Sequence, residues 1–434
     1  MTFFLSQPAG AAIAPWEKGA PGSGATVALG DVGAQGWNVL AEDLPLPAAI
    51  LKDSALRHNS RWMRAFLAGS GVQIAPHGKT TMSPELFRLQ IEDGAWGITL
   101  STPHQVRVAR AFGHSRIFLA NQLIGRAGIA YIVAELKRDP GFEFYCLVDS
   151  VQNVDQIAAA AAAADLGRPV RVLVELGFDG GRTGCRSLEE ALVVARAVRA
   201  TSGLVALAGV EGFEGIIRGP SVEETLARVT TFLDEMAALA YRCEAERLFA
   251  PGTVVFSAGG SAFFDLVAAK LGAIRLAQES MVLLRSGCYL THDSVMYTKL
   301  FALLAQRDQA LASSHGGLVP ALEVWAYVQS VPEPGRVIVA LGKRDVSYDD
   351  PPVALAWFRP GAGMAGPEPA PQDHRVTQLN DQHAYLSTPP DTPWRVGDMV
   401  GFGISHPCLT FDKWRVLHVV DDAYGVTGAV RTYF

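Results

Sequence analysis

The fold is decided by one short stretch of the sequence, Val72-Gln73-Ile74-Ala75-Pro76-His77-Gly78-Lys79-Thr80-Thr81-Met82. Its first four residues are mostly apolar and indicate a buried strand, which Pro76 and Gly78 end. A helix is expected to begin near Ser83-Pro84-Glu85, because serine is a common N-cap and proline suits the first helical position. Lys79 therefore stands where a parallel strand ends, and loss of solvent there favours a neutral, nucleophilic amine. For a lysine taken alone, a solvated position in a strand–helix loop is the commoner case.

The composition of the chain favours a large globular protein with extensive burial. Of 434 residues, 49% are hydrophobic and 18% are charged, and the length predicts two domains. The net charge of -6 argues against nucleic acid or an anionic membrane as the main partner. Five cysteines without a CxxC motif argue against a disulfide framework. Because the sequence has neither a convincing secretory signal nor an apolar run of transmembrane length, we expect a cytoplasmic protein without a membrane partner.

Outward from this stretch, short apolar runs alternate with segments of helical length. Eight such runs occur, at 72–75, 97–100, 116–120, 142–148, 170–176, 205–210, 253–256 and 281–284. This alternation predicts an α/β fold, and the strand count favours a (β/α)8 TIM barrel over a doubly wound open sheet. After about residue 300, β-branched and aromatic runs separated by proline and glycine predict a smaller, mostly β domain. We expect an arm over 1–45 that partly joins the β domain, the barrel over 46–300 and the β domain over 301–434.

In a barrel, chemistry occurs where strands end. Two glycine-rich loops follow the seventh and eighth strands, Ser257-Ala258-Gly259-Gly260-Ser261 and Arg285-Ser286-Gly287-Cys288. Free backbone N–H groups and serine hydroxyls in such loops bind phosphate, although glycine pairs also serve as plain turns. Arg182, between glycines in Gly180-Gly181-Arg182-Thr183-Gly184, is placed either to bind an anionic oxygen or to pair with Asp179 or Glu189. A phosphate-bearing carbonyl compound captured by Lys79 suggests pyridoxal 5'-phosphate (PLP).

The PHGKT stretch, the GRTG loop, the GG turn and the RSGCY turn followed by His292-Asp293 resemble fold-type III PLP enzymes. Within that group, which includes alanine racemase, the D-serine dehydratase and D-threonine aldolase branch is the most similar. The resemblance implies that Lys79 carries the cofactor and that Arg182 lies near its phenolic oxygen. It places Arg285 where alanine racemase contacts the pyridine nitrogen. The remaining residues expected to bind the cofactor are His77, Ser257, Gly259, Gly260, Ser286, Gly287 and Cys288.

The motif that discriminates between reactions is Ser405-His406-Pro407-Cys408 in the β domain. Imidazole and thiolate suit Zn2+, although two ligands alone make no site and a buried histidine or cysteine is commoner. By resemblance, the dehydratase branch has His-x-Cys here and the aldolase His-x-Asp, which suits Mn2+ or Mg2+. His406 and Cys408 are therefore the expected metal ligands, and Cys408 favours a dehydratase.

The resemblance implies a PLP- and zinc-dependent ammonia-lyase that converts D-serine or another D-3-hydroxy amino acid to a 2-oxo acid and ammonia. A metal-activated D-threonine aldolase is the alternative, and a non-catalytic PLP-binding protein of cofactor homeostasis is a third. The second domain and its His-x-Cys motif argue against that third interpretation. The related enzymes pair head to tail, so we expect a homodimer.

Overall fold

The computed structural model describes residues 11–22, 24–308, 311 and 316–434. Contacts between residues divide the chain into two compact units, which are described separately. The barrel unit comprises Arg64–Lys79 and Ile91–Gly287, and the β unit comprises Met1–Met63, Thr80–Gln90 and Cys288–Phe434. In the described parts of the chain, no helix has the length and apolar character needed to cross a membrane.

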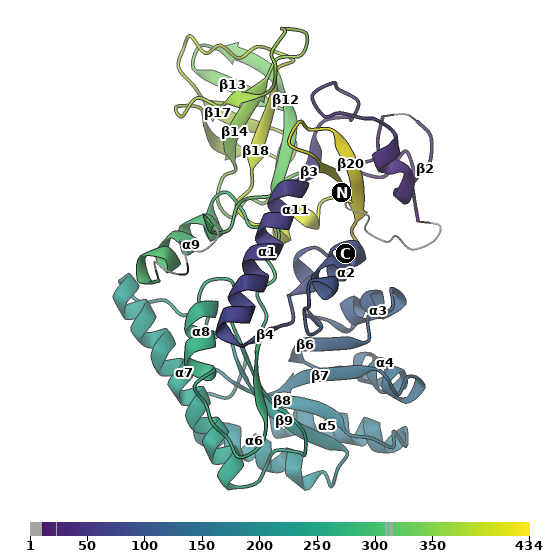
Figure 1. Cartoon of the computed structure of the whole chain (residues 1–434), viewed down its shortest axis with the longest axis vertical. Helices are drawn as coiled ribbons and strands as arrows, with labels where there is room; N and C mark the ends of the chain where they lie inside the picture. Colours follow the sequence, from purple (N-terminus) through teal and green to yellow (C-terminus); the bar gives the residue numbers. More distant parts are fainter. Residues whose placement is uncertain (1–10, 23, 309–310, 312–315) are drawn as a thin grey trace. The chain divides into compact units, whose positions relative to one another are not determined.

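The barrel unit is built on eight parallel strands (Figure 1). Neighbouring strands pair in the order β4-β11-β10-β9-β8-β7-β6-β5. The sheet closes because Trp96 N donates to Ile74 O at 2.8 Å and Thr99 N donates to Pro76 O at 3.0 Å, which joins β4 to β5. Closure confirms the predicted barrel against an open sheet. The strands are β4 (Gln73–Ile74), β5 (Ile98–Leu100), β6 (Arg116–Gln122), β7 (Glu143–Val148), β8 (Val170–Leu176), β9 (Val205–Gly212), β10 (Val254–Ala258) and β11 (Ser280–Leu284).

The helices of this unit follow the strands and begin at residues that suit helix starts. The side chains of Thr102, Ser150, Ser187 and Ser221 each accept a hydrogen bond from the backbone N–H three residues on. Such caps satisfy N–H groups that the helix itself leaves unpaired. The helices are α3 (Pro103–Ala111), α4 (Arg126–Arg138), α5 (Val151–Ala163), α6 (Leu188–Ala200), α7 (Val222–Ala245) and α8 (Phe264–Leu271).

Close approach of two barrel strands gives a stability prediction at Gly209. Gly209 on β9 pairs with Val255 on β10, and an added Cβ would lie 1.8 Å from the Val255 carbonyl oxygen. Because that oxygen belongs to a paired strand, Gly209→Ala is expected to destabilise the protein by about 3 kcal/mol or more in urea unfolding. Gly69→Ala is the matched control. A Cβ there meets nothing within 4 Å in α1 (Asp53–Ser70), so alanine should stabilise by about 0.5–1 kcal/mol. Equal stability of the two variants would contradict the close packing.

The β unit holds an antiparallel sheet in the order β15-β14-β18-β12-β13-β17-β16. Its longest strand, β12 (Leu322–Glu333), also pairs with β3 (Ala48–Lys52), which in turn pairs with β19 (Val416–Val420). Residues 48–52 therefore form sheet with the β unit, whereas the sequence patterns place them at the start of the barrel. The other strands are β13 (Arg336–Val339), β14 (Val353–Phe358), β15 (Glu368–Pro369), β16 (Arg375–Leu379), β17 (Ala384–Ser387), β18 (Met399–Gly403) and β20 (Val426–Arg431).

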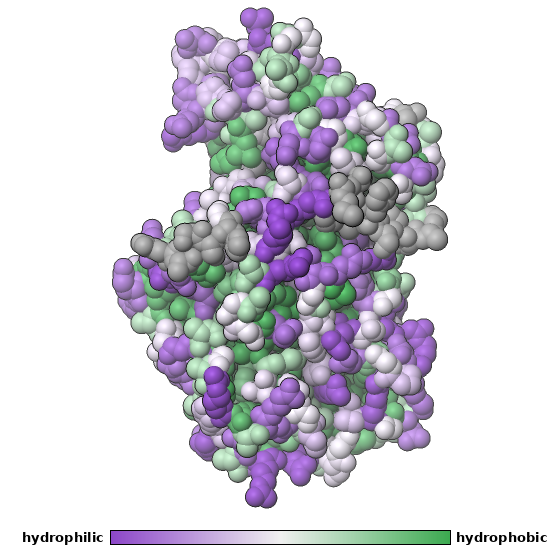
Figure 2. Space-filling view, viewed as in Figure 1, coloured by the Kyte–Doolittle hydropathy of each residue, from purple (hydrophilic) through white to green (hydrophobic). Residues whose placement is uncertain are grey.

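The core of the β unit also takes in residues of the N-terminal arm. Ile13 from β1 (Ala12–Ile13) and Leu29 and Val32 from the 3-10 helix η1 (Leu29–Ala34) pack in one cluster with Trp325 and Val416. Residues 11–22 and 24–45 thus contribute to this core, and the expected segment 1–10 lies outside the described residues. Figure 2 shows hydrophilic residues scattered over the visible face. The unit also contains α2 (Pro84–Glu92), over Pro84–Gln90, as well as α9 (Met296–Arg307), α11 (Cys408–Phe411) and β2 (Val27–Ala28).

Candidate active site

Lys79 lies in the 3-10 turn η2 (Gly78–Thr80) directly after β4, and its side chain is half-buried. Two residues earlier, His77 continues the pairing of β4 with β5 through a bridge to Thr99, and its Nε2 lies 3.3 Å from Ser101 Oγ. Burial, together with the positive charges of Lys79 and Arg285, holds the pKa of His77 well below its usual value. His77 is therefore neutral, and Lys79 and Arg285 act on it from the same end of the barrel.

Arg285 follows β11 and is buried inside the barrel unit. Its Nη2 lies 2.5 Å from Glu211 Oε1 and donates to Gly212 O at 3.0 Å. Burial raises the pKa of Glu211 to about 8, although the Arg285 charge opposes that rise. Arg285 Nε and His77 Nδ1 are buried and have no hydrogen-bond partner among the described residues. Buried polar atoms are rarely left unpaired, so these two nitrogens are suited to a ligand that the chain alone does not supply.

The glycine turn after β10 binds an anionic group within the chain. Gly259 N and Gly260 N donate to the carboxylate of Glu214 at 3.1 and 2.9 Å. Ser286 Oγ donates to the carbonyl oxygens of the same two glycines at 3.1 and 3.2 Å, which fixes the turn. Gly259 has φ +93°, a conformation that favours glycine. The predicted phosphate-binding N–H groups therefore converge on one anion, and Glu214 holds that place when no phosphate is bound.

The two other predicted residues of this region lie on either side of the turn. Ser257 is buried at the end of β10, and its hydroxyl donates to Leu283 O at 3.0 Å. Arg182 is exposed, and its guanidinium lies 4.7 Å from the centre of the Phe213 ring. Of the two carboxylates weighed as partners for Arg182, Glu189 instead pairs with Arg242 at 3.2 Å. A cation stacked on a ring keeps its N–H groups available to an anion.

The barrel unit thus offers the groups that PLP requires. Lys79 would carry the cofactor, the Gly259–Gly260 turn with Ser257, Ser286 and Gly287 would hold the phosphate, and His77, Arg182 and Arg285 would surround the ring. The unpaired Arg285 Nε and His77 Nδ1 support that fit. Sequence reasoning assigned no role to Glu211 or Glu214. The available signal was two glutamates flanking Gly212-Phe213 at a strand end, where a carboxylate is costly to bury unless it is paired.

The predicted metal ligands lie in the β unit, after β18. His406 Nδ1 lies 2.7 Å from Asp349 Oδ2, and His406 N donates to Ser347 Oγ at 3.0 Å. An imidazole held by a carboxylate through Nδ1 presents Nε2 to a metal, the usual arrangement around zinc. Burial lowers the pKa of His406, but Cys408 and Asp349 together outweigh it and raise the value to about 9.

Cys408 begins α11, and its sulfur lies 3.8 Å from Cys288 Sγ and 3.4 Å from Thr80 Oγ1. The hydrogen bond from Cys288 holds the pKa of Cys408 well below its usual value, so Cys408 carries the thiolate. The Cys288 side chain, expected at the cofactor, instead contacts Cys408. Over residues 11–22, 24–308, 311 and 316–434, no three histidine, cysteine, aspartate or glutamate side chains form a ready-made metal shell. The donors present, imidazole and thiolate, fit zinc by their chemistry.

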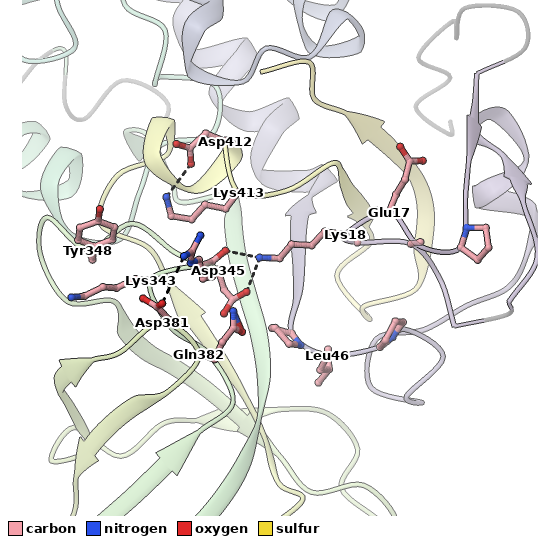
Figure 3. Close-up of a pocket in the computed structure, with 16 residues that line it drawn as sticks. Glu17, Lys18, Leu46, Lys343, Asp345, Tyr348, Asp381, Gln382, Asp412 and Lys413 are labelled. Carbon is pink, nitrogen blue, oxygen red and sulfur yellow. Dashed lines mark hydrogen bonds and ion pairs between the residues drawn. The ribbon is translucent and has the colours of Figure 1, made fainter.

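The β unit also contains a cavity of about 1040 Å3 outside these residues (Figure 3). Its charged side chains lie in pairs. Lys18 Nζ lies 2.7 Å from Asp345 Oδ1, and Lys413 Nζ lies 3.1 Å from Asp412 Oδ1. None of its lining residues belongs to the predicted cofactor or metal set. Because its charges are paired with one another, we assign this cavity no role.

Comparisons with known proteins agree with this division of the chain. The alanine racemase N-terminal domain matches residues 52–267, and the putative serine dehydratase domain matches residues 321–420. A D-threonine aldolase from Arthrobacter sp. is 26% identical over 377 residues, which are 87% of this chain and 89% of that protein. A D-threo-3-hydroxyaspartate dehydratase from Delftia sp. (strain HT23) is 28% identical over 269 residues, 62% of this chain and 66% of that protein.

Among solved structures, the D-threonine aldolase from Filomicrobium marinum has a TM-score of 0.73 and 21% identity, and the match covers 92% of this chain and 97% of that chain. At that identity the likeness concerns the fold. The two domain models carry the assignment further, since one matches the barrel that contains Lys79 and the other matches the sheet that contains His406 and Cys408. The chain therefore belongs to the fold-type III family of PLP enzymes, and the relatives that it matches are lyases.

Proposed function

We propose that the protein is a PLP- and zinc-dependent ammonia-lyase that converts D-serine or another D-3-hydroxy amino acid to a 2-oxo acid and ammonia. The similarity to lyases of D-3-hydroxy amino acids supports the substrate class. The observation that carries the choice of dehydration is the thiolate of Cys408 beside His406, because a sulfur donor favours zinc over manganese or magnesium. On the resemblance alone, we also propose a cytoplasmic homodimer.

The residues of the barrel unit supply binding and proton transfer. PLP, when bound, supplies an electron sink for the negative charge that forms at Cα. Lys79 Nζ anchors the cofactor covalently and, once the substrate has displaced it, removes the proton from Cα. Neutral His77 adds no further positive charge beside that amine, which favours its unprotonated form. Arg285, buried against Glu211, keeps a fixed positive charge in a site that excludes water.

In the β unit, His406 and Cys408 would hold the metal. Zinc would supply a Lewis acid that makes the β-hydroxyl a better leaving group. Asp349 fixes the orientation of His406 through Nδ1, and Ser347 fixes its backbone. Two peptide bonds tie these groups to the cofactor residues, since Thr80 follows Lys79 and Cys288 follows Gly287 in the chain.

A D-threonine aldolase is the second candidate. The relative from Arthrobacter sp. that matches 87% of this chain bears that name. An aldolase uses the same cofactor but breaks the Cα–Cβ bond after the β-hydroxyl loses its proton. The two reactions therefore differ in whether the oxygen leaves or keeps its bond to Cβ, and the products tell them apart.

The test is a panel of D-amino acids with product identification on zinc-loaded holoenzyme. We expect D-serine to give pyruvate and ammonia in equal amounts, and D-threonine or D-3-hydroxyaspartate to give the corresponding 2-oxo acid. L-Serine is the control and should give no product. Glycine and acetaldehyde from D-threonine without ammonia would contradict dehydration and support the aldolase. Failure of every D-3-hydroxy amino acid to react would contradict both proposals.

A further inference from the structure

We infer that Cys288 is a third ligand of the metal, so that the ion is held by one imidazole and two thiolates. The inference rests on the metal binding in the proposed function and deepens it, because it adds a ligand outside the His-x-Cys motif. Its consequence is a site that selects zinc and keeps one position open for substrate.

The two sulfurs already have the spacing that a shared zinc ion imposes. Cys288 Sγ and Cys408 Sγ lie 3.8 Å apart. Two sulfurs bound to one zinc at about 2.3 Å, in tetrahedral geometry, lie about 3.8 Å from each other. In the metal-free chain a proton occupies the contact, with Cys288 donating to the Cys408 thiolate. Zinc would replace that proton, which leaves to solvent, and both sulfurs would bind as thiolates.

The surroundings of Cys288 are those of a ligand. Cys288 is 4% exposed, and its sulfur also lies 3.7 Å from Thr80 Oγ1 and accepts a hydrogen bond from the Tyr297 side chain. Hydroxyl groups beside a sulfur stabilise its anionic form, so the pocket can hold a second thiolate once the ion is present. None of the other three cysteines, Cys146, Cys185 and Cys243, has a recorded contact with Cys408, and each is buried elsewhere in the barrel unit.

His406 completes the set from the other side. It contacts the Cys408 side chain, and Asp349 holds its Nδ1. Two thiolates and one imidazole make three protein donors, the number typical of catalytic zinc, whose fourth position is left for water or substrate. Thiolates also discriminate against Mn2+ and Mg2+, which prefer oxygen. The second sulfur therefore strengthens the selection of zinc beyond what His406 and Cys408 give.

Zinc K-edge X-ray absorption on the zinc-loaded holoenzyme, kept reduced, counts the sulfur neighbours directly. We expect two sulfurs in the wild type and one in Cys288→Ser, with zinc affinity at least about 100-fold weaker in the variant. Competition with a chelator measures that affinity. Cys185→Ser is the matched control, because Cys185 is also buried and its thiol donates to Asp149 O at 3.4 Å, an acceptor that serine keeps. The control should retain two sulfurs and unchanged affinity.

One sulfur in the wild type would overturn the inference, and so would no bound zinc. The wild-type measurement needs no variant, so the test stands even if Cys288→Ser fails to fold. The amino acid panel is scored separately. Two sulfurs without turnover would support the ligand and contradict the proposed reaction, whereas one sulfur with turnover would do the reverse.

Discussion

Lys79→Ala is expected to abolish the conversion of D-serine and to remove the covalent link between the protein and PLP. The loss of the proton-transfer role alone should lower kcat by about 10²–10⁴-fold. Loss of the anchor adds to that effect, since the amine at the end of β4 is the group placed to capture a carbonyl compound. Borohydride reduction followed by peptide mapping should label the peptide that contains Lys79 in the wild type and label nothing at that position in the variant.

Lys137→Ala is the matched control for this experiment. Lys137 lies on α4 in the same unit, is exposed, and its amine contacts the backbone of Ala164. The control should keep both turnover and the label at Lys79. A borohydride-sensitive link that persists in Lys79→Ala would overturn the assignment of this lysine. Retained turnover in the variant would have the same meaning.

Removal of the metal is expected to stop dehydration and leave PLP in place. The ligands of the two groups come from different residues, so a chelator should strip the ion without breaking the bond to Lys79. A Lewis acid is worth several kcal/mol at the leaving oxygen, which corresponds to a loss of at least about 10²-fold in kcat. Turnover and the borohydride label measured on the same sample separate the two effects, and added zinc should restore the rate.

His406→Ala should reproduce the effect of the chelator and should not recover with zinc. His104→Ala is its control, because His104 is exposed on α3 and should leave the rate unchanged. Full activity in metal-free enzyme would rule out a catalytic role for zinc. An enzyme that regains its rate with Mn2+ but not with Zn2+ would contradict the choice of metal and favour the aldolase.

The sequence predicts the barrel well because its strands are buried on both faces. In β8, for example, all residues except Arg171 are buried, so the strand appears in the sequence as an almost continuous apolar run. The helices are equally well marked, since Ser150, Ser187 and Ser221 are residues that suit helix starts. Lys79 at the end of β4 follows from the same patterns, because a proline and a glycine mark the end of the strand.

Other features depend on contacts between residues far apart in the sequence. No local pattern shows that Asp349 holds His406, or that Cys288 lies beside Cys408, 120 positions away. β16 and β20 were not predicted, because their residues are mostly half-exposed or interrupted and lack a clear alternation. The side of β3 was wrongly expected, since a short apolar strand before a helix looks the same whether it joins a barrel or an antiparallel sheet.

The pairing of β3 with β12 and β19 has a consequence for how the chain is made. The chain passes between the two units four times, at 63/64, 79/80, 90/91 and 287/288, so neither unit is one contiguous piece. Leu51 on β3 pairs with Leu322 on β12, so the sheet of the β unit cannot form until the ribosome has completed both. Such long-range pairing slows folding and leaves a nascent strand edge exposed. A gene fragment that encodes residues 64–287 would lack Thr80–Gln90 as a folded partner segment, and residues 288–434 would lack their central strand.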